Sequence, residues 1–246
     1  MAIITLTTDF GWRDGYVGAV KGVIARGAPA GTSIEDIAHD VPAGDIAHAA
    51  WVVATACREF PDGTIHVVVV DPGVGGARRG VIVRAHHMMF VGPDNGVFAY
   101  LGKRYGRAIT TRSGAAATFH GRDVFAPAAV ELARGLDVEQ LERVELAGGL
   151  PWGPRPEREG RVVHVDTYGN LITDLPSEEA GKEITIVGRR LPIRRTYEDV
   201  ATGDLVAYIG SQRTVEIAVR DGRADRTIDA PRGTRVAPVA ESDPYR

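Results

Sequence analysis

The stretch from Val67 to Arg78 combines a carboxylate, several glycines and an arginine in a pattern that can build an active site. It reads V-V-V-V-D-P-G-V-G-G-A-R, so Asp71 directly follows a run of four valines. The glycines at 73, 75 and 76 let the backbone turn tightly, which would return Arg78 to Asp71. A nearby guanidinium favours the charged form of a half-buried carboxylate. We therefore expect an anionic group that can hold a water molecule, with a purely structural Asp–Arg pair as the alternative.

Polar side chains also follow other predicted elements. Asp9 comes after a strand candidate, Asp94 and Asn95 lie in a G-P-D-N-G turn, and His120 stands before Gly-Arg-Asp at a helix entrance. Ligands gather at the carboxyl ends of parallel strands, so these groups are expected to converge with Asp71. Taken singly, an aspartate at a strand end is as readily a cap or turn residue. A lone histidine is likewise more often structural than catalytic.

Several familiar interpretations of these residues fail. The glycines do not match the P-loop, they match the dinucleotide fingerprint only weakly, and no serine stands in a G-x-S-x-G elbow. A metal hydrolase is a more serious alternative, because Asp9, Asp71, Asp94 and His120 could converge on a cation. Arg78 beside Asp71 would repel that cation. The pair His86-His87 is expected to lie on a strand and point to opposite faces, so it cannot easily share a site.

The elements that must position these residues alternate between strand and helix up to about residue 150. Such alternation predicts an α/β fold with a mostly parallel sheet flanked by helices. The apolar run 65–70 suits a strand covered on both faces. Other strands are expected at 3–8, 33–38, 80–85, 88–91 and 109–111, and helices from about Tyr16 to Gly27, from 45 to 58 and from 123 to 133.

The character of the chain changes near residue 150. L-P-W-G-P-R-P-E at 150–157 holds three prolines and is typical of a linker. Short strand-like runs separated by turn residues follow, which predicts a smaller antiparallel β-barrel. We therefore expect an N-terminal domain over 1–150, a linker over 151–160 and a C-terminal domain over 161–246. The expected strands of the second domain are 161–165, 171–173, 184–187, 205–209 and 215–219.

Composition narrows the possible partners and location. The formal net charge is −3 and is evenly spread, so no basic stripe is present to hold a nucleic acid. No apolar run approaches the length of a membrane span, and the N-terminus lacks a signal-peptide pattern, which favours a cytoplasmic protein. The single cysteine, Cys57, lies in an apolar helical run and is interpreted as a core thiol.

Six ordered motifs, spread over nearly the whole chain, resemble the S-adenosylmethionine hydroxide adenosyltransferases. This family comprises adenosine-forming S-adenosylmethionine hydrolases, relatives of the fluorinating and chlorinating enzymes. The motifs are T-T-D-F-G at 7–11, Y-V-G-A-V-K-G at 16–22, V-V-D-P-G-V-G at 69–75, G-P-D-N-G at 92–96, F-H-G-R-D-V-F-A-P at 119–127 and Y-G-N-L-I-T at 168–173.

The resemblance implies a set of site residues and an assembly. It gives Asp71, Arg78 and His120 as the catalytic set. It gives Asp9 as the ribose contact, Asn170 as the adenine contact, Tyr168 as a stacking ring, and Asp166 and Ser211 as the holders of the methionine amino and carboxylate groups. It further implies a homotrimer with active sites between the N-terminal domain of one subunit and the C-terminal domain of the next. The family's usual N-S-x-G-Y stretch departs here to G-S-Q-R-T at 210–214, which keeps Ser211 but lacks the glycine and the tyrosine.

The reaction that the resemblance implies is hydrolysis of S-adenosyl-L-methionine to adenosine and L-methionine, with no cofactor. Asp71 would accept a proton from the attacking water or orient it, and Arg78 would keep Asp71 charged and fixed. His120 would complete the hydrogen bonds of the water or relay its proton. Two alternatives stay open beside the metal hydrolase. One is a halide-using adenosyl transferase, which the anionic Asp71 disfavours, and the other is a sensor that binds S-adenosylmethionine or adenosine without turnover.

Overall fold

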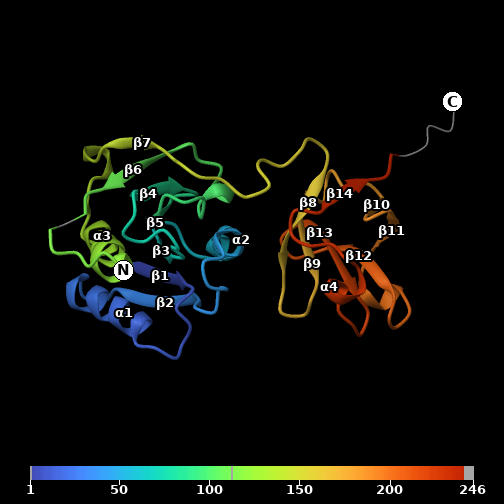
Figure 1. Ribbon diagram of the computed structural model, residues 1–246, viewed down its shortest axis with the longest axis horizontal. Helices are drawn as coiled ribbons and strands as arrows, with labels where there is room; N and C mark the ends of the chain where they lie inside the picture. Colours follow the sequence, from blue (N-terminus) through green and yellow to red (C-terminus); the bar gives the residue numbers. More distant parts are fainter. Residues whose placement is uncertain (1, 112, 241–246) are drawn as a thin grey trace. The chain divides into compact units, whose positions relative to one another are not determined.

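The computed structural model describes residues 2–111 and 113–240 of the chain. The chain forms two compact units, residues 1–150 and 151–246, each with its own apolar core (Figure 1). None of the helices in the described ranges is long and apolar enough to cross a membrane.

The N-terminal unit is built on a seven-stranded sheet with the order β2-β1-β3-β5-β4-β6-β7. The first four strands of that order are parallel: β2 (Ser33–Ala38), β1 (Ile3–Thr8), β3 (Ile65–Val69) and β5 (Met88–Pro93). The remaining strands add antiparallel pairs: β4 (Gly80–Ala85), β6 (Tyr105–Ile109) and β7 (Arg143–Glu145). The α/β class is therefore confirmed, with an antiparallel half that strand–helix alternation does not reveal.

Helices cover both faces of this sheet. Helices α1 (Tyr16–Gly27) and α3 (Ala126–Ala133) pack on one face, and α2 (Ile46–Ala56) packs on the other (Figure 1). Because successive strand residues point to opposite faces, the valine run of β3 serves both cores. Val67 and Val69 enter the α1–α3 core, and Val68 and Val70 enter the α2 core. The buried run places Asp71 at the strand end, at the rim of the sheet.

Short helical turns complete the N-terminal unit. They are η1 (Cys57–Glu59), η2 (Ala99–Leu101), the π-helix η3 (Gly121–Phe125) and η4 (Val138–Gln140). The helix expected over 123–133 thus begins as an α-helix only at Ala126. The strand expected at 109–111 lies at Tyr105–Ile109 instead, because its ladder to β4 outweighs its weak apolar signal. His86 and His87 are not on a strand: both have positive φ and form the turn between β4 and β5.

The C-terminal unit is a closed barrel with the strand order β10-β11-β12-β13-β9-β8-β14. Its pairs are antiparallel except β11 with β12, which is parallel. The strands are β8 (Gly160–Val165), β9 (Leu171–Pro176), β10 (Glu183–Ile186), β11 (Arg189–Arg194), β12 (Leu205–Ile209), β13 (Thr214–Val219) and β14 (Arg235–Pro238), with η5 (Tyr197–Asp199) and α4 (Ala224–Thr227) between them.

The predicted barrel is confirmed, and two of its strands were not expected from the sequence. β11 reads R-R-L-P-I-R and β14 reads R-V-A-P, so neither shows a clean apolar alternation. Closure of the barrel supplies their partners, because each finds hydrogen bonds on both sides. Local sequence cannot show that long-range pairing.

Candidate active site

A cavity of about 340 Å³ opens where β1 and β3 end. Asp9 follows β1 and Asp71 follows β3, so the two neighbouring parallel strands deliver two carboxylates to one place. His120 and Gly121 reach the same cavity from the start of η3. The full lining is Asp9, Phe10, Ala43, Gly44, Val69, Asp71, Pro72, Val74, Thr118, Phe119, His120 and Gly121.

Arg78 holds Asp71 and His120 together. Its Nε donates to Asp71 Oδ1 at 2.9 Å and its Nη2 pairs with Asp71 Oδ2, so both carboxylate oxygens are engaged. The same Nη2 lies 2.7 Å from His120 Nδ1. The side chains of Asp71 and Arg78 are only 5% and 11% exposed. Bidentate pairing of this kind fixes the direction of a carboxylate.

Arg78 stands behind the cavity instead of in its wall. Asp71 and His120 line the cavity, whereas Arg78 is absent from its lining and packs its guanidinium against the ring of Phe125, 5.3 Å from the ring centre. Arg78 therefore contacts two side chains of the cavity wall without belonging to that wall.

The glycine-rich turn makes this arrangement possible. Gly75 has a φ of 76°, and a Cβ at that position would lie 2.5 Å from the carbonyl oxygen of Ala117. Both the left-handed backbone and the close approach require glycine. The turn is closed by the amide of Val74 donating to the Asp71 carbonyl at 3.1 Å. The expectation that the glycines fold Arg78 back onto Asp71 agrees with this geometry.

The contact with Arg78 decides which ring nitrogen of His120 is free. A guanidinium only donates hydrogen bonds, so His120 Nδ1 must accept and carries no proton. A neutral His120 then holds its hydrogen on Nε2. Burial, and next the positive charge of Arg78, lower the pKa of His120 from its ordinary value, so this neutral form is favoured near neutral pH. His120 consequently offers a hydrogen-bond donor to the cavity.

Asp9 is fixed by a segment that the sequence did not single out. Its Oδ2 accepts a hydrogen bond from the amide of Gly44 at 2.8 Å, and Ala43 and Gly44 line the cavity beside it. The P-A-G-D stretch at 42–45 carries a turn signal, but its place next to Asp9 follows only from the parallel pairing of β1 with β2 and β3. This contact engages only one of the two carboxylate oxygens of Asp9.

Asp94 and Asn95 do not join the cavity. The Asp94 carboxylate accepts from Arg79 at 3.0 Å and from the amide of Ala147 at 2.8 Å, and the Asn95 amide donates to the Val70 carbonyl at 3.0 Å. Both therefore tie down neighbouring chain segments, which is the structural alternative expected of such turn residues. Within residues 2–111 and 113–240, no three His, Cys, Asp or Glu side chains are grouped as metal ligands.

The C-terminal unit holds a separate open pocket of about 820 Å³. Tyr168 and Asn170, the expected adenine contacts, both belong to its lining, and Tyr168 is 73% exposed. Asp166 lies next to them and bonds to the Asn170 side chain at 2.8 Å. The other lining residues are Thr196, Tyr197, Glu198, Val219, Arg220, Asp221, Gly222 and Arg223.

Ser211 is not brought to that pocket. It lies in the exposed turn between β12 and β13, whereas the pocket is lined by Val219 and the residues after it, at the other end of β13. The expected roles of Asp166 and Ser211 at the methionine end of the substrate stay predictions.

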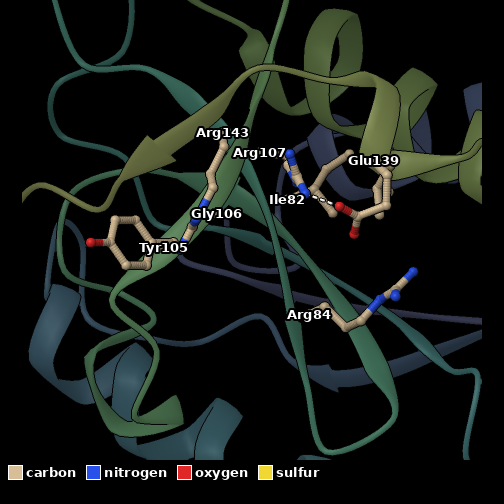
Figure 2. A pocket seen from close by; sticks show the side chains of 8 residues that line it. Ile82, Arg84, Tyr105, Gly106, Arg107, Glu139 and Arg143 are labelled. Carbon is tan, nitrogen blue, oxygen red and sulfur yellow. Dashed lines mark hydrogen bonds and ion pairs between the residues drawn. The ribbon is translucent and has the colours of Figure 1, made fainter.

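A third, smaller cavity of about 140 Å³ lies over β4 and β6 and contains none of the expected site residues (Figure 2). Two of the three arginines that line it contact a neighbouring side chain. Arg107 pairs with Glu139, and Arg143 lies 4.0 Å from the ring centre of Tyr105. Glu139 offsets the charge of Arg107, and neither a histidine nor a second carboxylate is among the lining residues.

Comparison with known proteins places both units in one family. The model of the SAM hydroxide adenosyltransferase N-terminal domain matches residues 4–142, and that of the C-terminal domain matches residues 160–237. A protein of Thermus thermophilus named (R)-S-adenosyl-L-methionine hydrolase is 39% identical, over 96% of this chain and 99% of its own. A Salinispora tropica protein of the same name is 37% identical, over 96% and 97%.

Two solved structures share the fold. A conserved hypothetical protein from Thermus thermophilus superposes with a TM-score of 0.84 at 37% identity, covering 97% of this chain and 100% of its own. An uncharacterized conserved protein from Thermotoga maritima gives a TM-score of 0.83 at 32% identity, covering 96% and 98%.

Proposed function

Because this chain belongs to the SAM hydroxide adenosyltransferase family, we propose that it hydrolyses S-adenosyl-L-methionine to adenosine and L-methionine. The observation that carries the proposal is the Asp71–Arg78–His120 arrangement at a cavity that also contains Asp9. The relatives named as hydrolases of this substrate support it over most of the chain length.

The chemistry needs a positioned water and little else. The oxygen of water forms a bond to C5′ of the ribose, the C5′–S bond breaks, and its electron pair leaves with sulfur as neutral methionine thioether. The positive charge of the sulfonium is replaced by a released proton, so one proton appears per turnover. Since the leaving group is already activated, the reaction requires no cofactor, and alignment of the water with the C5′–S bond becomes the main task.

Asp71 and His120 can hold such a water from two sides. The water donates one hydrogen to the Asp71 carboxylate and accepts one from His120 Nε2, which leaves its second lone pair for C5′. Arg78 keeps both partners in place from behind. Positioned proton acceptance is typically worth about 10²–10⁴-fold in rate. Asp9 accepts hydrogen bonds from the ribose hydroxyls, and this fixes the angle between the attacking water and the C5′–S bond.

The assembly is part of the proposal. Tyr168 stacks on the adenine and Asn170 bonds to it, while Asp166 holds the amino group of methionine. Ser211, which lies outside the lining of this pocket, is the proposed contact of the methionine carboxylate. A homotrimer joins the N-terminal cavity of one subunit to the C-terminal pocket of the next. A cytoplasmic location remains a prediction of the sequence.

The direct test mixes the protein with S-adenosyl-L-methionine and separates the products by chromatography. Adenosine and methionine in equal amounts are expected, and the two sulfonium epimers are supplied separately because the relatives are named for the (R) form. Parallel reactions with added chloride or fluoride test the halide alternative through 5′-halo-adenosine. Asp71→Asn is expected to lower turnover by about 10²-fold or more while adenosine still binds.

Each failure has its own meaning. Adenosine binding without any product would make the protein a sensor. Undiminished activity of Asp71→Asn would mean that the Asp71–Arg78 pair is structural. Loss of activity with a chelator would support the metal-hydrolase alternative.

A further inference from the structure

The side chain of Asn170 is held between hydrogen-bond acceptors. The residue is 6% exposed and stands directly before β9 in the wall of the C-terminal pocket. Its Nδ2 donates to Asp166 Oδ2 at 2.8 Å and reaches the hydroxyl of Tyr197 at 3.5 Å. A carboxylate only accepts hydrogen bonds, so the amide must turn its nitrogen toward Asp166. The carbonyl oxygen Oδ1 is left as the group that a ligand can meet.

Asp166 is itself fixed by the loop that it builds. Its Oδ1 accepts the backbone amides of Tyr168 at 2.9 Å and Asn170 at 2.8 Å. Its own amide donates to the Asn170 carbonyl at 3.1 Å, and the Gly169 amide donates back to the Asp166 carbonyl at 3.0 Å. The carboxylate therefore cannot rotate away without breaking the turn. One lone pair on Oδ2 stays open, so the expected contact with a methionine amino group is not blocked.

A chain of hydroxyl groups engages the same amide nitrogen of Asn170 that donates to Asp166. The hydroxyl oxygens of Tyr197 and Tyr208 lie 2.6 Å apart, and Tyr208 donates to Glu216 Oε2 at 2.6 Å. Burial raises the pKa of Tyr208, so this hydroxyl keeps its proton and remains a donor. The hydrogen of Tyr197 then points to Tyr208, and its oxygen is free to accept from Asn170. Asp166 and Tyr197 thus both accept from the amide nitrogen of Asn170.

We propose that Asp166, supported by the Tyr197–Tyr208–Glu216 chain, is a positioning residue that fixes Asn170 with its carbonyl oxygen toward the pocket. This arrangement selects a purine with a 6-amino group over one with a 6-oxo group. The inference rests on the proposed function, which places the adenine in this pocket. An amino group donates to Oδ1, whereas a 6-oxo group meets it as a second acceptor and leaves both unpaired. Such a mismatch is expected to cost about 10- to 100-fold in affinity.

The test compares adenosine with inosine as ligands of the full-length protein, by titration calorimetry. Wild type is expected to prefer adenosine by about 10-fold or more. Asp166→Asn retains an oxygen for the two backbone amides but turns an N–H toward Asn170, which must then flip and present its own N–H to the pocket. We therefore expect Asp166→Asn to reverse the preference toward inosine. Tyr197→Phe keeps Asp166 in place. It is expected to reduce the ratio of adenosine affinity to inosine affinity without reversing the preference.

Glu179→Gln is the matched control, because it makes the same carboxylate-to-amide change in the same unit on a side chain that pairs with Arg155, outside the pocket lining. Its adenosine-to-inosine ratio should equal that of wild type. Equal weakening of both ligands in Asp166→Asn, with an unchanged ratio, would overturn the inference, and so would a wild type without preference. Absence of adenosine formation from S-adenosyl-L-methionine would instead refute the proposed function, so the two failures are distinguishable.

Discussion

His120 can act in the cavity through only one of its two ring nitrogens. Nδ1 accepts from Arg78, so a second proton on the ring would have to sit between the histidine and a guanidinium. Burial and the charge of Arg78 lower the pKa of His120 below its ordinary value of 6.5. Protonation would break the contact that orients the ring. At the scale of single residues, an acidic pH should therefore disrupt the contact between Arg78 and His120.

The first prediction concerns the pH dependence of kcat. Because the pKa of His120 is lowered, the neutral ring persists at pH 6.5 and is lost only as the pH falls further, so kcat should be flat near neutrality and decline on the acid side below 6.5. His120→Gln should reduce kcat and move this acid limb. Stopped-time assays across pH measure both. An acid limb unchanged in His120→Gln would assign it to another group.

The second prediction separates the charge of Arg78 from its geometry. Lysine keeps the charge but cannot bond to both Asp71 oxygens and His120 at once. Arg78→Lys should therefore lower kcat by about 10-fold or more, with little change in KM, because Arg78 does not line the cavity. Arg122→Lys is the control, since Arg122 pairs with Asp123 nearby and is also outside the lining. Equal kcat values for the two variants would contradict the assigned role.

The site could be predicted from sequence only where its residues are close in the chain or match a motif. The return of Arg78 to Asp71 follows from the short glycine-rich segment between them. The link to His120 and the placement of Gly44 beside Asp9 depend on sheet pairing between distant strands. Asp94 carries the same local signal as Asp9, yet an arginine and a distant backbone amide engage it, which no local pattern reveals.

At the scale of elements, β3 carries a buried titratable group that no site uses. His66 points into the α2 side of the sheet, bonds to Thr5 Oγ1 through Nδ1 at 2.7 Å and stacks on Phe90 with ring centres 4.8 Å apart. It is 1% exposed, and burial lowers its pKa to about 4. The unfolded chain therefore binds a proton at His66 in a pH range where the folded strand does not.

The third prediction is an acid-dependent loss of stability from this strand. The folded pKa lies below the unfolded value of 6.5, so the stabilisation is complete above pH 6.5 and disappears as the pH falls toward 4. The difference corresponds to about 3 kcal/mol of unfolding free energy. Urea denaturation should show a shallower pH dependence for His66→Gln than for wild type. His87→Gln, in the exposed β4–β5 turn, should retain the wild-type slope; identical slopes in all three proteins would rule out His66 as the source of the acid sensitivity.

The fold class was predictable because its strongest elements carry their own signal. β3 is almost entirely apolar, with His66 as its one polar residue, β12 is an apolar run, and β13 alternates between polar or small residues and large apolar ones. Local sequence predicts the antiparallel edge of the first sheet and the strands β11 and β14 less well. These strands are short and partly polar, and hydrogen bonds to neighbouring strands stabilise their conformation. The π-helix at 121–125 was not predicted either, because its conformation depends on packing against distant residues. It brings Gly121 against Val69 and Phe10, where a Cβ would be crowded.

At the scale of the whole molecule, the proposed trimer makes each active site a product of two subunits. The N-terminal unit carries Asp71 in one cavity and the C-terminal unit carries Asn170 in another pocket. Asp71→Asn and Asn170→Ala therefore disable different halves of a site. If sites form between neighbouring subunits, a mixed assembly contains some sites with both halves intact.

The fourth prediction uses that complementation. Equal amounts of Asp71→Asn and Asn170→Ala, unfolded together and refolded, should recover about a quarter of wild-type activity, because a site needs one intact half from each variant. Mixing Asp71→Asn with the double variant should recover none. Activity no higher than the sum of the separate variants would place each site within a single subunit.

The proposed mechanism depends on a water molecule, held by Asp71 and His120, that attacks C5′ of the ribose. Hydrolysis in ¹⁸O-labelled water, followed by mass spectrometry of both products, follows the oxygen of that water to its product. One labelled oxygen is expected in the 5′-hydroxyl of adenosine, and none in methionine. Label in methionine, or unlabelled adenosine, would refute the attack at C5′.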